Sequence, residues 1–252
     1  MASDTKVDTA PLLFIAAQHM GLEPFWLIPN GLFGITTPHG ERYINFARSP
    51  LNSHVSASLV RDKYAARAIL ARNHLPNIPY RLCRTIEDAR QFLAVHRTIV
   101  VKPRSGSGSR DIHIVSQPSQ LVGLTIAHYI CEKYIPGTEM RYLLLNDEVI
   151  AVHHSEYGAS VAADRTLQRI SYAPQDWDPA LVAMTRRIAS AFGLHFAAVD
   201  FMIAENGHAY ILEINSTPGL KWFHAPSSGP PVDAARLLLE AILVAGPTPP
   251  VM

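Results

Sequence analysis

Apolar and polar positions in the first 60 residues predict one helix followed by strands. The mostly apolar residues 11–20 end at Gly21, which predicts a short helix. Residues 25–28, 32–37 and 42–46 are strand-like runs separated by turn residues such as Asn30-Gly31. The pattern therefore indicates a small N-terminal α/β unit.

A longer helix is expected after Pro50, with Asn52 or Ser53 as its N-cap. Its apolar stripe consists of Val55, Leu59, Ala66 and Leu70. Lys63 lies on the same stripe, four residues after Leu59 and three before Ala66. Two explanations stay open: the charge meets a ligand, or the aliphatic stem lies along the edge of the apolar face.

Helical and strand-like segments interleave through the rest of the chain. Further helices are predicted at residues 85–95, 119–129, 179–192 and 231–244. The first has Thr85 as its cap and Asp88 in its first turns, and the third has Asp178 as its cap and Gly193 at its end. Further strands are predicted at residues 98–101, 111–115, 130–135, 139–145, 149–153, 197–204 and 208–214, with a loop at 158–168. This order predicts a mixed α+β (α/β) chain whose parts form one catalytic unit.

Composition and charge remove several classes of function. Of the 252 residues, 48% are apolar and 17% are charged, so the chain can bury a large core. The 22 basic and 21 acidic residues give a net charge of +1, which provides no excess for binding nucleic acid or an anionic membrane. Cys83 and Cys131 are too few for a disulfide framework or a closed zinc site. Without a signal-peptide pattern or a membrane-length apolar run, we expect a cytoplasmic protein.

The segment around Asn206-Gly207 predicts a hairpin that carries two carboxylates. A two-residue Asn-Gly turn would place Asp200 directly opposite Glu213, with Asn215 on the same side of the sheet. Like charges in opposition are destabilising, so a cation is expected between them. Carboxylate and amide oxygens suit Mg²⁺. The alternative is a hydrated, exposed sheet face, and the apolar residues on both faces of this segment argue against it.

A second motif combines a lysine with a loop of small residues. Lys102 ends a β-branched run, and Pro103 leads into a loop that contains Ser105, Gly106, Ser107, Gly108 and Ser109. Backbone N–H groups of such a loop can converge on phosphate oxygens while Lys102 supplies a point charge. The loop lacks the residue order of a P-loop and leads into a strand, so it is neither a P-loop nor a dinucleotide fingerprint. Together with a metal site, it favours a nucleoside triphosphate as ligand.

A third motif covers residues 132–141. Glu139 and Arg141 are two apart on a predicted strand, so they share one face. The carboxylate could accept from ribose hydroxyls and the arginine could bind phosphate, although a surface ion pair is the simpler alternative.

Taken in order, these motifs resemble the ATP-grasp superfamily of carboxylate–amine ligases. The matching residues are Asp62-Lys63, Val101-Lys102-Pro103, residues 132–135, Gly137-Thr138-Glu139, Val199-Asp200-Phe201 and residues 213–219. The resemblance implies an ATP-grasp fold of two α+β lobes that grip the nucleotide. The expected parts are a reduced N-terminal lobe (1–60), a central lobe (61–131) and a C-terminal lobe with the metal site (132–252).

The resemblance also implies a role for each matching residue. Lys63 and Lys102 would contact the phosphates and the adenine side of ATP, and the loop residues 105–109 would close over its β- and γ-phosphates. Glu132, Lys133, Tyr134 and Ile135 would line the adenine, and Glu139 would bind the ribose. Asp200, Glu213 and Asn215 would hold one or two Mg²⁺ ions, for which Mn²⁺ could substitute.

The implied reaction is amide-bond formation through an acyl phosphate, with release of ADP and phosphate. A closer resemblance to the ATP-grasp part of cyanophycin synthetase and to glutathione-synthetase-like ligases implies amino acids as carboxylate and amine, hence dipeptide synthesis. It rests on residues 49–53 and on residues 218–230.

The chain departs from the family in two places. Its N-terminal unit is short, which implies either a small substrate or a site completed by a second subunit of a homodimer. Positions where relatives carry an arginine hold Ala198 and His153-His154-Ser155. Arg169 is therefore the leading candidate for stabilising the oxyanion of the tetrahedral intermediate. Weaker candidates for contact with the intermediate or substrate are Arg141, Arg165, Ser216, Gly219 and His224.

Three other functions stay open on the sequence alone. A ligase of the same chemistry could act on a peptide or protein terminus. A catalytically silent ATP-binding regulator is a second alternative, although Lys102, Asp200, Glu213 and Asn215 are all retained. A phosphotransferase that stops at the phosphorylated substrate is the third.

Overall fold

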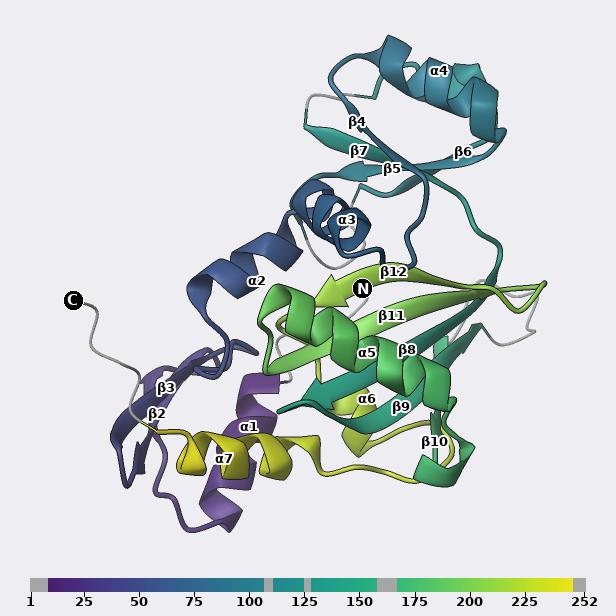
Figure 1. Ribbon diagram of the computed structural model, residues 1–252. Helices are drawn as coiled ribbons and strands as arrows, with labels where there is room; N and C mark the ends of the chain where they lie inside the picture. Colours follow the sequence, from purple (N-terminus) through teal and green to yellow (C-terminus); the bar gives the residue numbers. More distant parts are fainter. Residues whose placement is uncertain (1–8, 107–110, 125–127, 158–166, 247–252) are drawn as a thin grey trace. The chain divides into compact units, whose positions relative to one another are not determined.

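The structure is a computed structural model that describes residues 9–106, 111–124, 128–157 and 167–246 (Figure 1). The chain forms two compact units, each assembled from separate stretches of sequence. Unit 1 comprises Met1–Ala57, Met140–Val199 and Asn215–Met252, and unit 2 comprises Ser58–Glu139 and Asp200–Ile214. The consecutive lobe boundaries expected at residues 60 and 131 stay a prediction.

Unit 1 contains a three-stranded antiparallel sheet and most of a five-stranded one. The first has the order β1-β2-β3, with β1 (Phe25–Ile28), β2 (Leu32–Thr37) and β3 (Gly40–Asn45). The second has the order β10-β9-β8-β11-β12, with β8 (Gly137–Leu145), β9 (Glu148–Tyr157), β10 (Leu167–Tyr172), β11 (Phe196–Ala204) and β12 (Ala209–Asn215). The helices of unit 1 are α1 (Thr9–His19), α5 (Pro179–Phe192), α6 (Lys221–His224) and α7 (Ala234–Val244), with a 3-10 turn at Pro174–Asp176.

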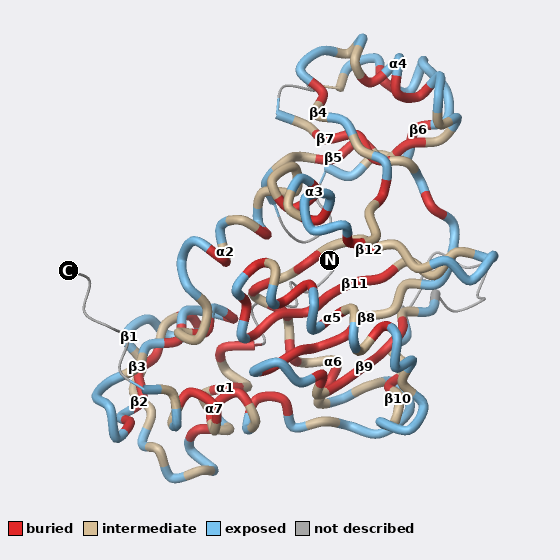
Figure 2. Tube along the Cα trace, viewed as in Figure 1, coloured by how far each residue is buried: buried red, intermediate tan, exposed pale blue. Residues whose placement is uncertain are grey.

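One hydrophobic core joins the N-terminal elements of unit 1 to its C-terminal helix. Leu13 of α1, Phe33 of β2, Leu143 of β8 and Leu238 of α7 are each no more than 1% exposed and belong to the same cluster. In the tube view, buried segments of α1 and α7 lie side by side (Figure 2). The short N-terminal segment therefore folds as part of a larger core.

Unit 2 is built on a four-stranded antiparallel sheet of order β4-β7-β5-β6. Its strands are β4 (Tyr80–Cys83), β5 (Ile99–Pro103), β6 (His113–Val115) and β7 (Tyr129–Lys133). Its helical elements are the C-terminal half of α2 (His54–Arg61), α3 (Lys63–Arg72), α4 (Ile86–His96) and the 3-10 turn Pro118–Leu121. Helix α4 covers one face of the sheet, where Phe92 and Leu93 pack with Val101 and Cys131. The opposite face of the sheet carries the polar residues described below.

Several local predictions are confirmed because their signals act within one turn of helix. Thr85 caps α4 in a reciprocal arrangement with Asp88, and Asp178 caps α5. Gly193 ends α5 in the left-handed conformation. None of the described helices combines the length and apolar character needed to cross a bilayer.

The helix expected after Pro50 is broken into α2 and α3. Asp62 stands between them and accepts hydrogen bonds from the backbone N–H groups of Tyr64 and Ala65, which starts a new helix. The continuous stripe is therefore wrong at its first position, because Val55 is 65% exposed. Ser53 caps α2 through Ser56 N–H.

Two other segments differ from the prediction. The helix expected at 119–129 is wrong, because the described part contains only the 3-10 turn and Tyr129 already begins β7. Most of the loop expected at 158–168 lies outside the described residues, but Leu167 and Gln168 belong to β10, a strand that was not predicted. Strand β10 pairs with β9 along six positions, so tertiary pairing outweighs its weak local pattern.

Candidate active site

Three buried charges form the centre of a polar cluster in unit 2. Lys102 of β5 and Glu132 of β7 share the sheet face opposite α4, because Val100 pairs with Glu132 and Lys102 with Ile130. Lys102 Nζ lies 2.8 Å from one Glu132 carboxylate oxygen, and Arg67 Nε of α3 lies 2.8 Å from the other. All three residues are at most 5% exposed. The carboxylate is thus shared by two cations.

This arrangement keeps Glu132 ionised in spite of its burial. Burial alone would raise the pKa of the carboxyl, but the charges and hydrogen bonds of Arg67 and Lys102 lower that pKa to about 2. The resemblance implies that Glu132 lies at the adenine. In the structure its carboxylate binds two protein cations and fixes the position of Lys102, and its contact with adenine stays a prediction.

Arg67 was not singled out from the sequence. Its guanidinium also donates to the carbonyl oxygens of Ile211 (2.6 Å) and Leu212 (2.8 Å) in β12. A signal was present, since Arg67 follows Lys63 by one helical repeat and so lies on the same stripe. A basic residue on this stripe is also explained by its aliphatic stem lying along the apolar face, so the spacing alone did not identify Arg67.

The lysine predicted from α3 lines the same pocket as the lysine from β5. The pocket is bordered by Lys63, Lys102, Glu132 and Glu213 together with apolar residues of α3 and β12. Lys63 Nζ donates to Gly106 O at 3.1 Å and lies 3.8 Å from a Glu213 carboxylate oxygen. Burial lowers the pKa of Lys63, and Glu213 partly offsets this. Of the two explanations for Lys63, the structure favours the ligand-facing one, because its side chain lines the same pocket as Lys102 and Glu213.

The turn of the carboxylate hairpin differs from the prediction. Ala204 N–H donates to His208 O, and Gly207 N–H donates to Ala204 O. These bonds define a three-residue loop in which Gly207 has φ +78°, so the two-residue Asn-Gly turn is wrong. If the register at the turn continued along the hairpin, Leu212 and not Glu213 would lie opposite Asp200.

An irregularity in β12 lies between this turn and Glu213. In a regular strand successive carbonyl groups point to opposite sides, yet the Arg67 guanidinium donates hydrogen bonds to the carbonyl oxygens of both Ile211 and Leu212. Ile211 and Ile214 are also both buried although they are three apart. One extra residue in β12 here would shift the pairing by one and set Glu213 opposite Asp200 again.

The donor set around Asp200 and Glu213 fits Mg²⁺ by its chemistry. Asp200 is 2% exposed, whereas the Glu213 side chain is 42% exposed. Asn215 Oδ1 accepts from Thr217 N–H (2.9 Å), which orients the amide. Among the described residues no cluster of three His, Cys, Asp or Glu side chains suits a metal, and the magnesium site of Asp200, Glu213 and Asn215 stays a prediction.

The remaining predicted nucleotide contacts are distributed over several backbone segments. Lys133 N–H donates to Pro79 O and Tyr134 N–H donates to Thr98 O, while Ile135 is buried. Ser105 bridges to Asp62, whose carboxylate forms an ion pair with Arg104. Ser107, Gly108 and Ser109 lie outside the described residues. Glu139 lies in β8, and its role stays a prediction.

A second polar row lies on one face of β8, β9 and β10 in unit 1. Arg141 and Ser171 both pair with His153, one from each neighbouring strand. Arg169 pairs with Ser155 and so points to the same face. The two predicted arginines are thereby brought to one side of the sheet, with His153 between them.

His153 is buried at 2% exposure, and its ring packs against Phe223 in a tilted arrangement with the ring centroids 4.6 Å apart. Burial, followed by the charges of Arg141 and Arg169, lowers the pKa of His153 to about 2. Within the described part of the chain, His153 Nδ1 and Ser171 Oγ are buried with no hydrogen-bond partner. Sequence reasoning missed both groups, because their importance depends on three-strand pairing.

The weaker candidates lie in different settings. His224 Nε2 accepts from Ala235 N–H at 3.0 Å at the start of α7, and burial lowers the pKa of His224. His224 therefore has a packing role at the start of α7, and its contact with substrate stays a prediction. Ser216 is 8% exposed and Gly219 lies between β12 and α6, whereas Arg165 lies outside the described residues.

Comparisons with known proteins agree with this geometry. Residues 60–242 match the RimK-like ATP-grasp domain, so the chain belongs to this family. A D-alanine–D-alanine ligase of Geobacter sulfurreducens is 26% identical over 184 residues, which cover 66% of this chain and 58% of the relative. The chain thus spans less than two thirds of the length of that ligase.

Two solved structures share the fold. The macrocyclase MdnC of Microcystis aeruginosa, bound with the precursor peptide MdnA, has a TM-score of 0.67 at 14% identity, with 97% of each chain covered. A bifunctional glutathione synthetase of Pasteurella multocida has a TM-score of 0.69 at 15% identity, with 93% of this chain and 44% of the other covered. The predicted ATP-grasp fold of class α+β is therefore confirmed. ATP-grasp ligases use ATP and Mg²⁺ and form C–N bonds, as the resemblance implied.

Proposed function

We propose that the chain is an ATP-dependent ligase that joins a carboxylate to an amine through an acyl phosphate. The observation that carries the proposal is that Lys63, Lys102 and Glu213 line the same pocket. Two lysines can neutralise the phosphates of ATP, and a carboxylate beside them could hold Mg²⁺, which would add positive charge at the phosphates. Glu132 and Arg67 keep Lys102 in place, so the charge is positioned before the nucleotide binds.

In this proposal Asp200, Glu213 and Asn215 hold Mg²⁺, which supplies charge neutralisation at the phosphates. Glu139 binds the ribose, and Lys133, Tyr134 and Ile135 line the adenine. Arg169, with Arg141, stabilises the oxyanion of the tetrahedral intermediate. Amino acids are the proposed substrates, and cytoplasmic location and a homodimer remain predictions.

The test is ADP and phosphate release by the full chain with ATP, Mg²⁺ and a matrix of single and paired amino acids. We expect release only with particular pairs, a condensed product by mass spectrometry, and loss of both in Asp200→Asn and in excess EDTA. Phosphorylated substrate without a condensed product would identify a phosphotransferase instead. ATP binding with no turnover on amino acids or peptides would favour the regulator.

A further inference from the structure

One edge of the unit 2 sheet offers unpaired backbone groups. Strand β4 is the first strand in the order β4-β7-β5-β6 and pairs only with β7 among the described strands. Lys133 N–H donates to Pro79 O, so the ladder bonds to β7 involve Pro79, Arg81 and Cys83. The N–H and C=O groups of Tyr80 and Leu82 consequently point away from β7. A strand laid along this edge would find two donors and two acceptors at regular spacing.

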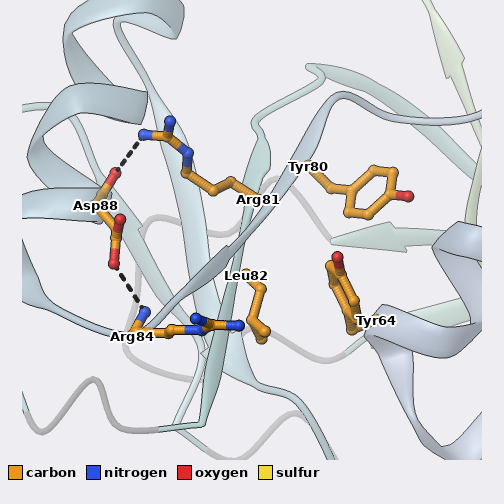
Figure 3. Close-up of a pocket in the computed structure, with 6 residues that line it drawn as sticks. All are labelled: Tyr64, Tyr80, Arg81, Leu82, Arg84 and Asp88. Carbon is orange, nitrogen blue, oxygen red and sulfur yellow. Dashed lines mark hydrogen bonds between the residues drawn. The ribbon is translucent and has the colours of Figure 1, made fainter.

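An open pocket of about 470 Å³ adjoins this edge. It is lined by Tyr64, Tyr80, Arg81, Leu82, Arg84 and Asp88 (Figure 3). Tyr64 and Tyr80 meet edge to face with ring centroids 5.8 Å apart and form an aromatic wall. The pocket shares no lining residue with the pocket that contains Lys63 and Lys102.

The charges around the pocket leave one arginine available. Arg81 extends to α4, where it donates to Asp88 O and to Gln91 Oε1 (Figure 3). The Asp88 carboxylate accepts hydrogen bonds from the backbone N–H of Arg84 and from Thr85. These bonds belong to the cap of α4. The exposed Arg84 guanidinium forms no ion pair with any described residue and lies on the Leu82 side of the pocket (Figure 3). The net local charge that a ligand meets is therefore positive.

We propose that the β4 edge binds an extended acidic peptide segment by strand addition. Its main chain would pair with Tyr80 and Leu82, and an acidic side chain would reach Arg84 while its neighbours pack on Tyr64 and Tyr80. The charge complementarity with Arg84 selects an acidic over a basic segment. This inference rests on the proposed ligase function, because it names a peptide as one of the two substrates, with an amino acid as the other.

The experiment is fluorescence anisotropy of the full chain with three labelled peptides, without ATP. The first peptide is Glu-Val-Glu-Val-Glu-Val-Glu, the second has Lys in place of Glu, and the third is the first with N-methyl groups at alternate residues. We expect the acidic peptide to bind at least tenfold more tightly than the other two. N-methylation removes the donors of one strand edge and leaves the charge unchanged.

A matched pair of protein variants locates the site. Arg84→Glu should weaken binding of the acidic peptide at least tenfold, whereas Arg187→Glu, at an exposed position of α5, should stay within twofold of the unmodified chain. Equal binding of the Glu and Lys peptides, equal binding by Arg84→Glu and the unmodified chain, or no binding at all would overturn the proposal.

The two proposals fail in different ways. Peptide binding without ADP release on any substrate would remove the ligase function and leave the docking edge. ADP release with free amino acids, in a chain that binds none of the three peptides, would remove the docking edge and leave the ligase.

Discussion

The two cationic clusters of the chain differ in how their charges are satisfied. In unit 2, Arg67 and Lys102 share the Glu132 carboxylate at 2.8 Å each. In unit 1, Arg141 and Arg169 act on His153, whose Nδ1 has no hydrogen-bond partner in the described structure. A buried charge or polar group is costly unless it is paired. The first cluster is thus complete within the protein, whereas the second retains polar atoms that an anionic ligand could satisfy.

The largest effect is expected from breaking the complete cluster. Glu132→Gln leaves Arg67 and Lys102, both at most 5% exposed, without their shared anion. Removing one partner of a buried ion pair costs about 3–5 kcal/mol, so we expect a loss of that size in the free energy of unfolding. Urea denaturation followed by tryptophan fluorescence measures it.

The matched control removes one of the stranded cations as well. The double variant Glu132→Gln, Lys102→Met should regain part of the lost stability while remaining inactive. A loss below about 1 kcal/mol in Glu132→Gln would show that water satisfies the two cations, and the cluster would then not be complete within the protein.

The next largest effect is expected in the second cluster. If Arg169 stabilises the oxyanion of the tetrahedral intermediate, Arg169→Ala should lower kcat by about 10²–10³ with little change in the KM for ATP. Arg186→Ala, at an exposed position of α5, is the matched control. Near-normal turnover in Arg169→Ala would transfer the role to Arg141 of β8.

A smaller effect is expected from the lysine that borders the complete cluster. Lys63→Met keeps the aliphatic stem but removes the charge near Glu213, which lies 3.8 Å away. Loss of one hydrogen bond to a charged group costs about 1.5–3 kcal/mol, or roughly 10- to 100-fold in affinity. Titration calorimetry with ATP and Mg²⁺ should show this loss, and Arg72→Met at the exposed end of α3 should not. Unchanged affinity would mean that Lys63 serves only the loop through Gly106.

What the sequence could reveal differs between local and long-range features. Caps such as Thr85 with Asp88 depend on residues three apart, so their patterns were readable. The family motifs likewise placed Lys63, Lys102 and Glu213, which line one pocket. Arg67 and Glu132 are 65 residues apart, and neither periodicity nor spacing relates them.

Turn geometry explains another part of the difference. Asn-Gly suits a two-residue turn, but it also suits a three-residue loop whose glycine adopts a positive φ. One residue of difference changes which side chains oppose each other across the hairpin. The position of Glu213 therefore depends on the local shape of β12 around Leu212, where Arg67 donates hydrogen bonds to two successive carbonyl oxygens.

The smallest effect concerns the pH dependence of the second cluster. The unfolded chain binds a proton at His153 near pH 6.5, whereas the folded protein does so only near pH 2. The unfolded state thus holds more protons in that window, and stability falls as the pH decreases below 6.5. Between about pH 6 and 5, His153→Gln should flatten the stability curve by about 1.4 kcal/mol per pH unit. Denaturant titrations at several pH values measure the slope.

The choice of window separates His153 from Glu132, because that carboxyl titrates near pH 4.5 when unfolded and about 2 when folded. Parallel curves for His153→Gln and the unmodified chain would show that His153 is protonated in the folded protein. An anion placed beside Arg141 and Arg169 would balance the positive charge of this cluster, as the Glu132 carboxylate balances the charge of Lys102. Saturating phosphate should therefore raise the pKa of His153 and weaken the slope in the unmodified chain only, because the negative charge offsets the two arginines.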